Sequence, residues 1–165
     1  MFGWSEKEKT SSKIKQATSA ALKGSCFSAR DAAAFGLNDE ASSTLYYEVV
    51  AHQINSLSFM VSILYGSRAW CNLDFFGTNV GAGLIEAETE LNIKPSMVVW
   101  IWRRFSELQL MPKEEAADGG QARSSAAAVK KLDSKANESS IMQTIEAVVY
   151  RYDRFAGQIF GIPAG

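Results

Sequence analysis

Apolar residues recur at steps of three and four along three long stretches of the chain, and this spacing predicts three amphipathic helices. We expect them over residues 39–65, 96–111 and 138–160. The third stretch has the most regular stripe, formed by Ile141, Ile145, Val148, Tyr152, Phe155 and Ile159. Side chains spaced in this way share one helix face and must be covered by another element. The pattern predicts an all-α fold, a bundle of about four to five helices.

The other two long helices carry similar stripes. The stripe of 39–65 consists of Tyr46, Val50, Gln53, Leu57, Met60 and Leu64. The stripe of 96–111 consists of Val98, Ile101, Phe105 and Leu108. Gly66 and Pro112 follow these stretches and are expected to end the two helices.

The first 24 residues predict a further helix of different character. Ser5 and Glu8 match a capping box, and Gly24 suits the position after the last turn. The segment is rich in lysine and has a thin apolar face. We therefore expect residues 1–24 to form an N-terminal arm or solvated outer helix, and residues 25–165 to form a single bundle domain.

Weaker signals lie between the long helices. A short helix is expected over 28–35, and an irregular aromatic segment over 67–79, where strands are not excluded. Thr78 or Asn79 then caps a short helix that Gly81 and Gly83 weaken. Residues 113–137 contain almost no large apolar side chain and predict a flexible, low-complexity linker.

Composition and charge narrow the class of protein. Hydrophobic residues make up 47% of the 165 positions and the formal net charge is −1, so a nucleic-acid partner is not expected. The apolar runs are too short for a transmembrane segment, and the charged start does not suit a signal peptide. We expect a cytoplasmic protein in which Cys26 and Cys71 are free, although an oxidising compartment would allow one disulfide between them.

Most catalytic and metal-binding motifs are missing from the sequence. His52 is the only histidine, which excludes paired Glu-x-x-His motifs and the H-E-x-x-H zinc helix. The chain has no G-x-S-x-G motif, and the glycine-rich run over 77–83 lacks the ending of a phosphate loop. We therefore expect no cofactor and no metal, and we assign no catalytic residue.

One candidate ligand pocket remains, between the helices over 39–65 and 96–111. Glu48 and His52 lie one turn apart and share a helix face, with Gln53 beside them and Trp100 and Arg103 across the pocket. These residues suggest a small-molecule-binding or sensing domain, or an enzyme that uses Glu48 and His52. A hydrogen-bonded, half-buried histidine with a structural role is the simpler interpretation.

The tryptophan-rich run indicates an interaction surface instead. Trp100, Trp102, Arg103 and Arg104 have the composition of protein interfaces. The leading hypothesis is a non-enzymatic interaction module such as an adaptor, inhibitor, immunity-type protein or regulatory partner. Its partner is another protein or a second copy, which would bind through the 141–159 stripe or the Trp100/Trp102 surface. The acidic residues Glu86, Glu88 and Glu90 form a solvated face or meet a basic partner.

Overall fold

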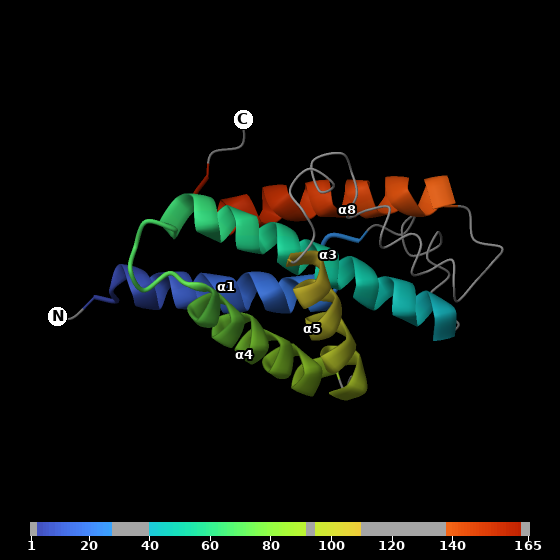
Figure 1. Ribbon diagram of the computed structural model, residues 1–165, viewed down its shortest axis with the longest axis horizontal. Helices are drawn as coiled ribbons and strands as arrows, with labels where there is room; N and C mark the ends of the chain where they lie inside the picture. Colours follow the sequence, from blue (N-terminus) through green and yellow to red (C-terminus); the bar gives the residue numbers. More distant parts are fainter. Residues whose placement is uncertain (1–2, 28–39, 92–94, 110–137, 163–165) are drawn as a thin grey trace.

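The computed structural model describes residues 3–27, 40–91, 95–109 and 138–162, and helices are the regular elements in these ranges (Figure 1). They are α1 (Glu6–Leu22), α3 (Glu40–Tyr65), α4 (Leu73–Leu91), α5 (Pro95–Gln109) and α8 (Glu138–Ile159). The predicted all-α bundle is confirmed. The helix expected at 28–35 and the linker expected at 113–137 lie outside the described residues. No helix in the described part of the chain is long and apolar enough to cross a membrane.

The ends of α1 follow the capping signals in the sequence. The Ser5 hydroxyl accepts a hydrogen bond from the Glu8 amide at 3.2 Å. At the other end, Gly24 adopts a positive φ of 70°. Its amide donates to Ala21 O, and the next amide, of Ser25, donates to Ala20 O, each at 3.1 Å. These two bonds form a Schellman motif, which satisfies carbonyls that a helix end leaves free.

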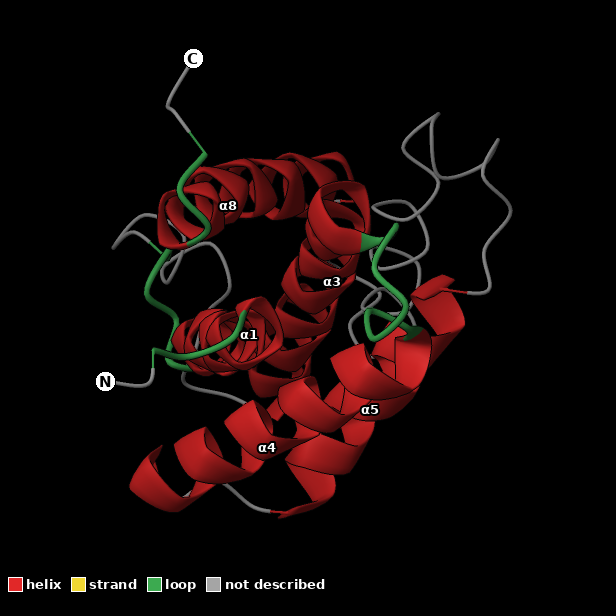
Figure 2. Ribbon diagram, turned by 90° about the vertical axis from the view of Figure 1, so that its left-hand side faces the viewer, coloured by secondary structure: helices red, strands yellow, loops and turns green. Residues whose placement is uncertain are grey.

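The position of α1 differs from the predicted arm or solvated outer helix. It packs against α4, α3 and α8, with Ile14 and Leu22 fully buried (Figures 1 and 2). The thin apolar face of α1 is enough to hold it in the bundle because small residues let the neighbouring helices approach closely. At Gly83 of α4, an added Cβ would lie only 2.9 Å from Lys15 O of α1. The first helix is therefore an inner member of the bundle.

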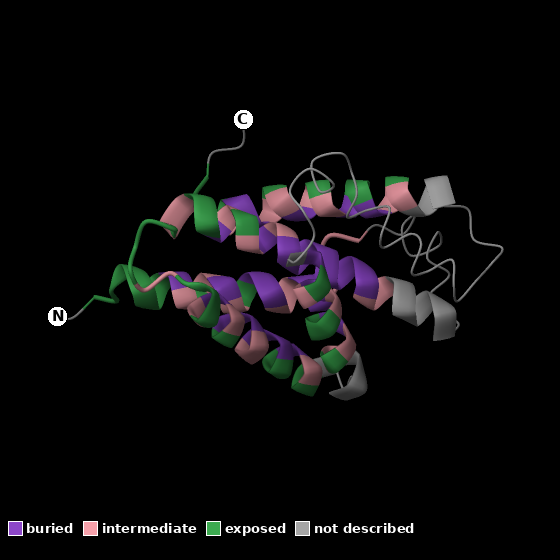
Figure 3. Ribbon diagram, viewed as in Figure 1, coloured by how far each residue is buried: buried purple, intermediate pink, exposed green. Residues whose placement is uncertain are grey.

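Helix α3 is the most enclosed element in the described structure. Every residue from Glu48 to Asn55 is buried, so burial extends well beyond the predicted stripe (Figure 3). Helices α1, α5 and α8 all pack against it. This middle segment of α3 is covered on all sides, and a segment of this kind need not show a one-sided apolar pattern.

Helix α4 begins earlier than the sequence predicts. The Asn72 side chain caps α4, because its Oδ1 accepts a hydrogen bond from the Phe75 amide at 2.8 Å. Asn79, predicted as a possible cap, instead lies inside the helix and is buried. Its Nδ2 donates to Phe75 O at 2.9 Å, and its Oδ1 accepts a bond from Ser11 of α1. The second part of the segment expected to be irregular, from Leu73 on, is thus helical.

The central residues of the predicted α8 stripe pack inside the bundle, and Phe155 and Ile159 are partly buried. Ile145, Val148 and Tyr152 are fully buried. The Tyr152 hydroxyl donates to Ala17 O of α1 at 2.8 Å. The centre of this stripe is therefore covered by the chain's own helices and offers no surface for a second copy.

Helices α4 and α5 lie at an angle and pack on different partners. Helix α4 packs mainly on α1, and α5 packs mainly on α3 through its buried residues Ile101, Phe105 and Leu108. Contact between α4 and α5 themselves is slight, and Figure 2 shows the two helices along one side of the bundle. This arrangement leaves a groove between them.

Candidate interaction surface

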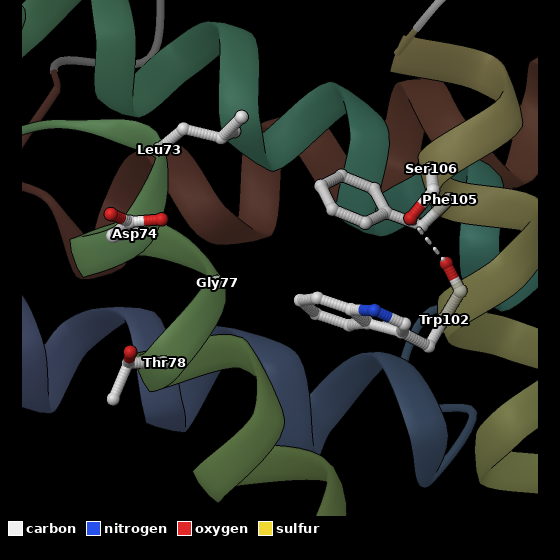
Figure 4. Close-up of a pocket in the computed structure, with 7 residues that line it drawn as sticks. All are labelled: Leu73, Asp74, Gly77, Thr78, Trp102, Phe105 and Ser106. Carbon is white, nitrogen blue, oxygen red and sulfur yellow. Dashed lines mark hydrogen bonds between the residues drawn. The ribbon is translucent and has the colours of Figure 1, made fainter.

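The groove between α4 and α5 has a volume of about 610 Å³. Its lining comes from the start of α4 and the second half of α5, and consists of Leu73, Asp74, Gly77, Thr78, Trp102, Phe105 and Ser106 (Figure 4). We call this feature the groove. Pockets of this volume are typical of sites that take up ligand or partner groups.

Trp102 and Phe105 line the groove with aromatic rings. Their centroids are 5.6 Å apart, and Figure 4 shows the Trp102 ring extending from α5 towards Gly77 of α4. A Cβ added at Gly77 would lie 3.1 Å from Trp102 Cη2, so the missing side chain makes room for the indole. Trp102 nevertheless remains 39% exposed, while Phe105 is buried.

Exposed apolar side chains continue beyond the groove onto α3. Leu73 also lines a second pocket of about 260 Å³, together with Phe59. Ile63 lies one turn after Phe59 on the same face of α3. The exposed fractions are 49% for Phe59, 84% for Ile63 and 67% for Leu73. We call Phe59, Ile63, Leu73 and Trp102 the apolar surface; contiguous surfaces of this kind often mark interaction sites.

The α4 side of the groove is acidic. Helix α4 carries Asp74, Glu86, Glu88 and Glu90 and contains no lysine or arginine. Asp74 lines the groove, and Glu86 is exposed. Glu90 forms an ion pair with Lys23 of α1. The three glutamates and the negative end of the helix dipole lie at the other end of α4, so Asp74 is the carboxylate within the lining itself.

The structure joins two predicted site residues that the sequence placed in different sites. Arg104, an interface candidate, binds Glu48, a pocket candidate, with 2.7 Å between Nη2 and Oε1. Burial opposes the charge on Arg104, but its bonds and attraction to Glu48, aided by Glu107, hold its pKa above the ordinary value. Arg104 therefore ties α5 to α3 and is not part of the exposed surface.

His52 is more enclosed than the half-buried, hydrogen-bonded residue expected from the sequence. It is buried, and neither ring nitrogen has a hydrogen-bond partner among the residues that the structure describes. Burial, with a smaller effect of Arg104, lowers the pKa of His52 to about 4. The imidazole is therefore neutral at physiological pH. Gln53 is also buried, and its Nε2 has no partner in the described part of the chain.

The remaining interface candidates divide between two places. The guanidinium of Arg103 lies 4.9 Å from the centroid of the Trp100 ring, a cation–π distance. Trp100 is half-buried, whereas Trp102 lines the groove. Of the four predicted interface residues, Trp102 is thus the one found in the groove.

The described residues give little support for a reactive cysteine or a metal site. Cys26 and Cys71 are free and partly buried. Burial raises the pKa of both thiols, which favours the unreactive protonated form. No group of three histidine, cysteine or acidic side chains within the described ranges could hold a metal ion.

Sequence reasoning missed three members of the apolar surface: Phe59, Ile63 and Leu73. The first two lie off the predicted stripe of α3, which identified the buried face only. Leu73 fell in the segment expected to be irregular, and the capping signal that could have revealed it is Asn72.

Comparison of the chain with protein-family models, curated proteins and solved structures found no match.

Proposed function

We propose that this chain is a protein–protein interaction module that binds a partner segment through the groove and the adjoining apolar surface. The observation that carries the proposal is the exposure of Trp102 and Leu73 on either side of the groove, continued by Phe59 and Ile63. Removing such side chains from water contributes roughly 25 cal/mol per Å². Large side chains that lie in a preformed groove are typical anchor points of protein interfaces.

The alternative functions receive less support. A small-molecule site or an enzyme centre at Glu48 and His52 would need both groups to face a ligand. Glu48 is buried against Arg104, and the His52 ring is enclosed. Self-association through the α8 stripe would require residues that the bundle already covers. A second copy bound at the groove remains as a competing form of the proposed interaction.

The test compares four proteins: wild type, Leu73→Ser, Trp102→Ala and the control Tyr150→Ala. Tyr150 is as exposed as Leu73 but lies on α8. Each protein is used for quantitative affinity capture from an extract of the cells that produce it, and urea unfolding checks that each variant folds. Because Leu73 is exposed in the first turn of α4, its variant keeps the test valid if Trp102→Ala unfolds.

We expect a protein that wild type and Tyr150→Ala retain equally, and that Leu73→Ser and Trp102→Ala retain at least tenfold less well. Sedimentation velocity of the same four proteins detects self-association. Equal capture by all four, with a monomeric wild type, would contradict the proposal.

A further inference from the structure

We infer that the partner segment is a basic amphipathic helix that lays its apolar face in the groove. The inference rests on the proposed function and adds the chemistry of the partner. It depends on two independent features of the described residues: the shape of the groove and the distribution of charge on α4.

The shape of the groove suits a helix. Two helices form its walls, and the α5 wall lines it with the aromatic rings of Trp102 and Phe105. Next to the groove on α4, a Cβ added at Gly81 would meet nothing within 4 Å, and Ala82 is partly exposed. Small side chains on this wall let a third helix approach closely. Amphipathic helices that bind such grooves insert residues spaced by three, four and seven positions.

The charge on α4 selects the sign of the partner. Asp74 lies in the groove lining at the start of α4, and Glu88 is partly exposed on the same face of α4 about four turns further along. The lining contains no lysine or arginine, so no positive side chain offsets Asp74 there. Lysine or arginine residues beside the apolar stripe of a bound helix would face these carboxylates. Complementary charges of this kind raise association rates and exclude partners of the wrong sign.

The same charges disfavour other occupants. A two-fold contact between copies uses the same surface on both chains. It would therefore place two copies of the acidic α4 wall, each with Asp74 and Glu88, in one interface. Nucleic acid and anionic membranes present phosphate groups to the same acidic wall. A basic helix removes apolar area from water without that repulsion.

The experiment is a display selection with the full-length protein as bait. The library encodes 20-residue helices with leucine fixed along one stripe. The flanking positions vary equally among lysine, glutamate, glutamine and serine. Binders are selected on wild type and then screened on Leu73→Ser, so that groove-dependent binders are recognised by their loss of binding. Individual binders are measured at two salt concentrations.

We expect groove-dependent binders to be enriched severalfold in lysine over glutamate. Asp74→Asn and Glu88→Gln should each weaken such a binder by roughly threefold and reduce its salt dependence. The matched control Glu146→Gln, an exposed position on α8, should leave the affinity unchanged. Groove-dependent binders without lysine enrichment, or binders indifferent to both substitutions on α4, would overturn the inference and leave the proposed function standing. A selection that yields no groove-dependent binder would contradict the proposed function itself.

Discussion

Both carboxylate oxygens of Glu48 lie 2.8 Å from Nε of Arg104, and this contact joins the most enclosed part of α3 to α5. The side chain of Glu48 is 1% exposed and that of Arg104 is 12% exposed. The two side chains of this buried pair are well bonded, but each charge is stabilised mainly by the other because water is excluded. The pair therefore fixes the position of α5, and with it the position of Trp102 in the groove.

Removing one partner of this pair should be costly. In Arg104→Met the carboxylate of Glu48 would remain buried without its main cation, so we expect the free energy of unfolding to fall by about 3–5 kcal/mol. The double variant Glu48→Leu with Arg104→Met should lose less than Arg104→Met alone, because no isolated charge is left. Urea unfolding at pH 7 measures both effects. The exposed pair of Glu6 and Arg68 provides the control, since Arg68→Met should have a much smaller effect. Equal losses at the two pairs would contradict this account.

His52 should make the protein less stable in mild acid. Burial lowers the pKa of His52 to about 4, against an ordinary value of 6.5. Between these values the unfolded chain binds a proton that the folded chain does not. The free energy of unfolding should therefore fall as the pH drops from about 6.5 to about 4, by roughly 3 kcal/mol in all.

The variant His52→Leu isolates this effect from other titrating groups. Asp153, whose pKa is raised by burial, titrates with the opposite sign and is present in both proteins. The difference in unfolding free energy between wild type and His52→Leu, measured by urea unfolding from pH 4 to pH 8, should therefore change through this window. Parallel pH profiles would show that His52 is protonated equally in the folded and unfolded chains.

Two glycines of α4 should respond to alanine in opposite ways. Gly81→Ala should raise the free energy of unfolding by about 0.5–1 kcal/mol, because alanine is the better helix former and the new Cβ meets nothing. Gly83→Ala should lower it by roughly 1–3 kcal/mol, because the new Cβ would approach Lys15 O and Thr18 of α1. Thermal unfolding monitored by circular dichroism compares the two. A gain in stability for Gly83→Ala would mean that α1 and α4 pack less closely than described.

The long helices could be predicted from the sequence because spacing alone determines which side chains share a face. The buried residues of α5 and the centre of the α8 stripe follow that rule directly. The role of α1 could not be predicted in this way, because close approach at Gly83 depends on a helix elsewhere in the chain. Small residues on α1 are apolar enough for burial but give a weak periodic signal.

The candidate site was predictable only in part. Trp102 could be singled out because tryptophan and arginine occur together in its helix. The pairing of Arg104 with Glu48 could not, since 56 positions separate them and spacing within one helix carries no information about the other. Leu73 shows a third case: its exposure depends on how α4 lies beside α5, which no local pattern reveals.

The bond from Tyr152 to Ala17 has a consequence for synthesis, since it spans 135 positions of the chain. On the ribosome, the first helix emerges long before the last one. Until α8 is translated, the inner surface of α1 lacks one of the elements that cover it, and the Ala17 carbonyl lacks the tyrosine that binds it. Closure of the core must therefore wait for the last part of the chain, unlike in bundles whose neighbours in space are also neighbours in sequence.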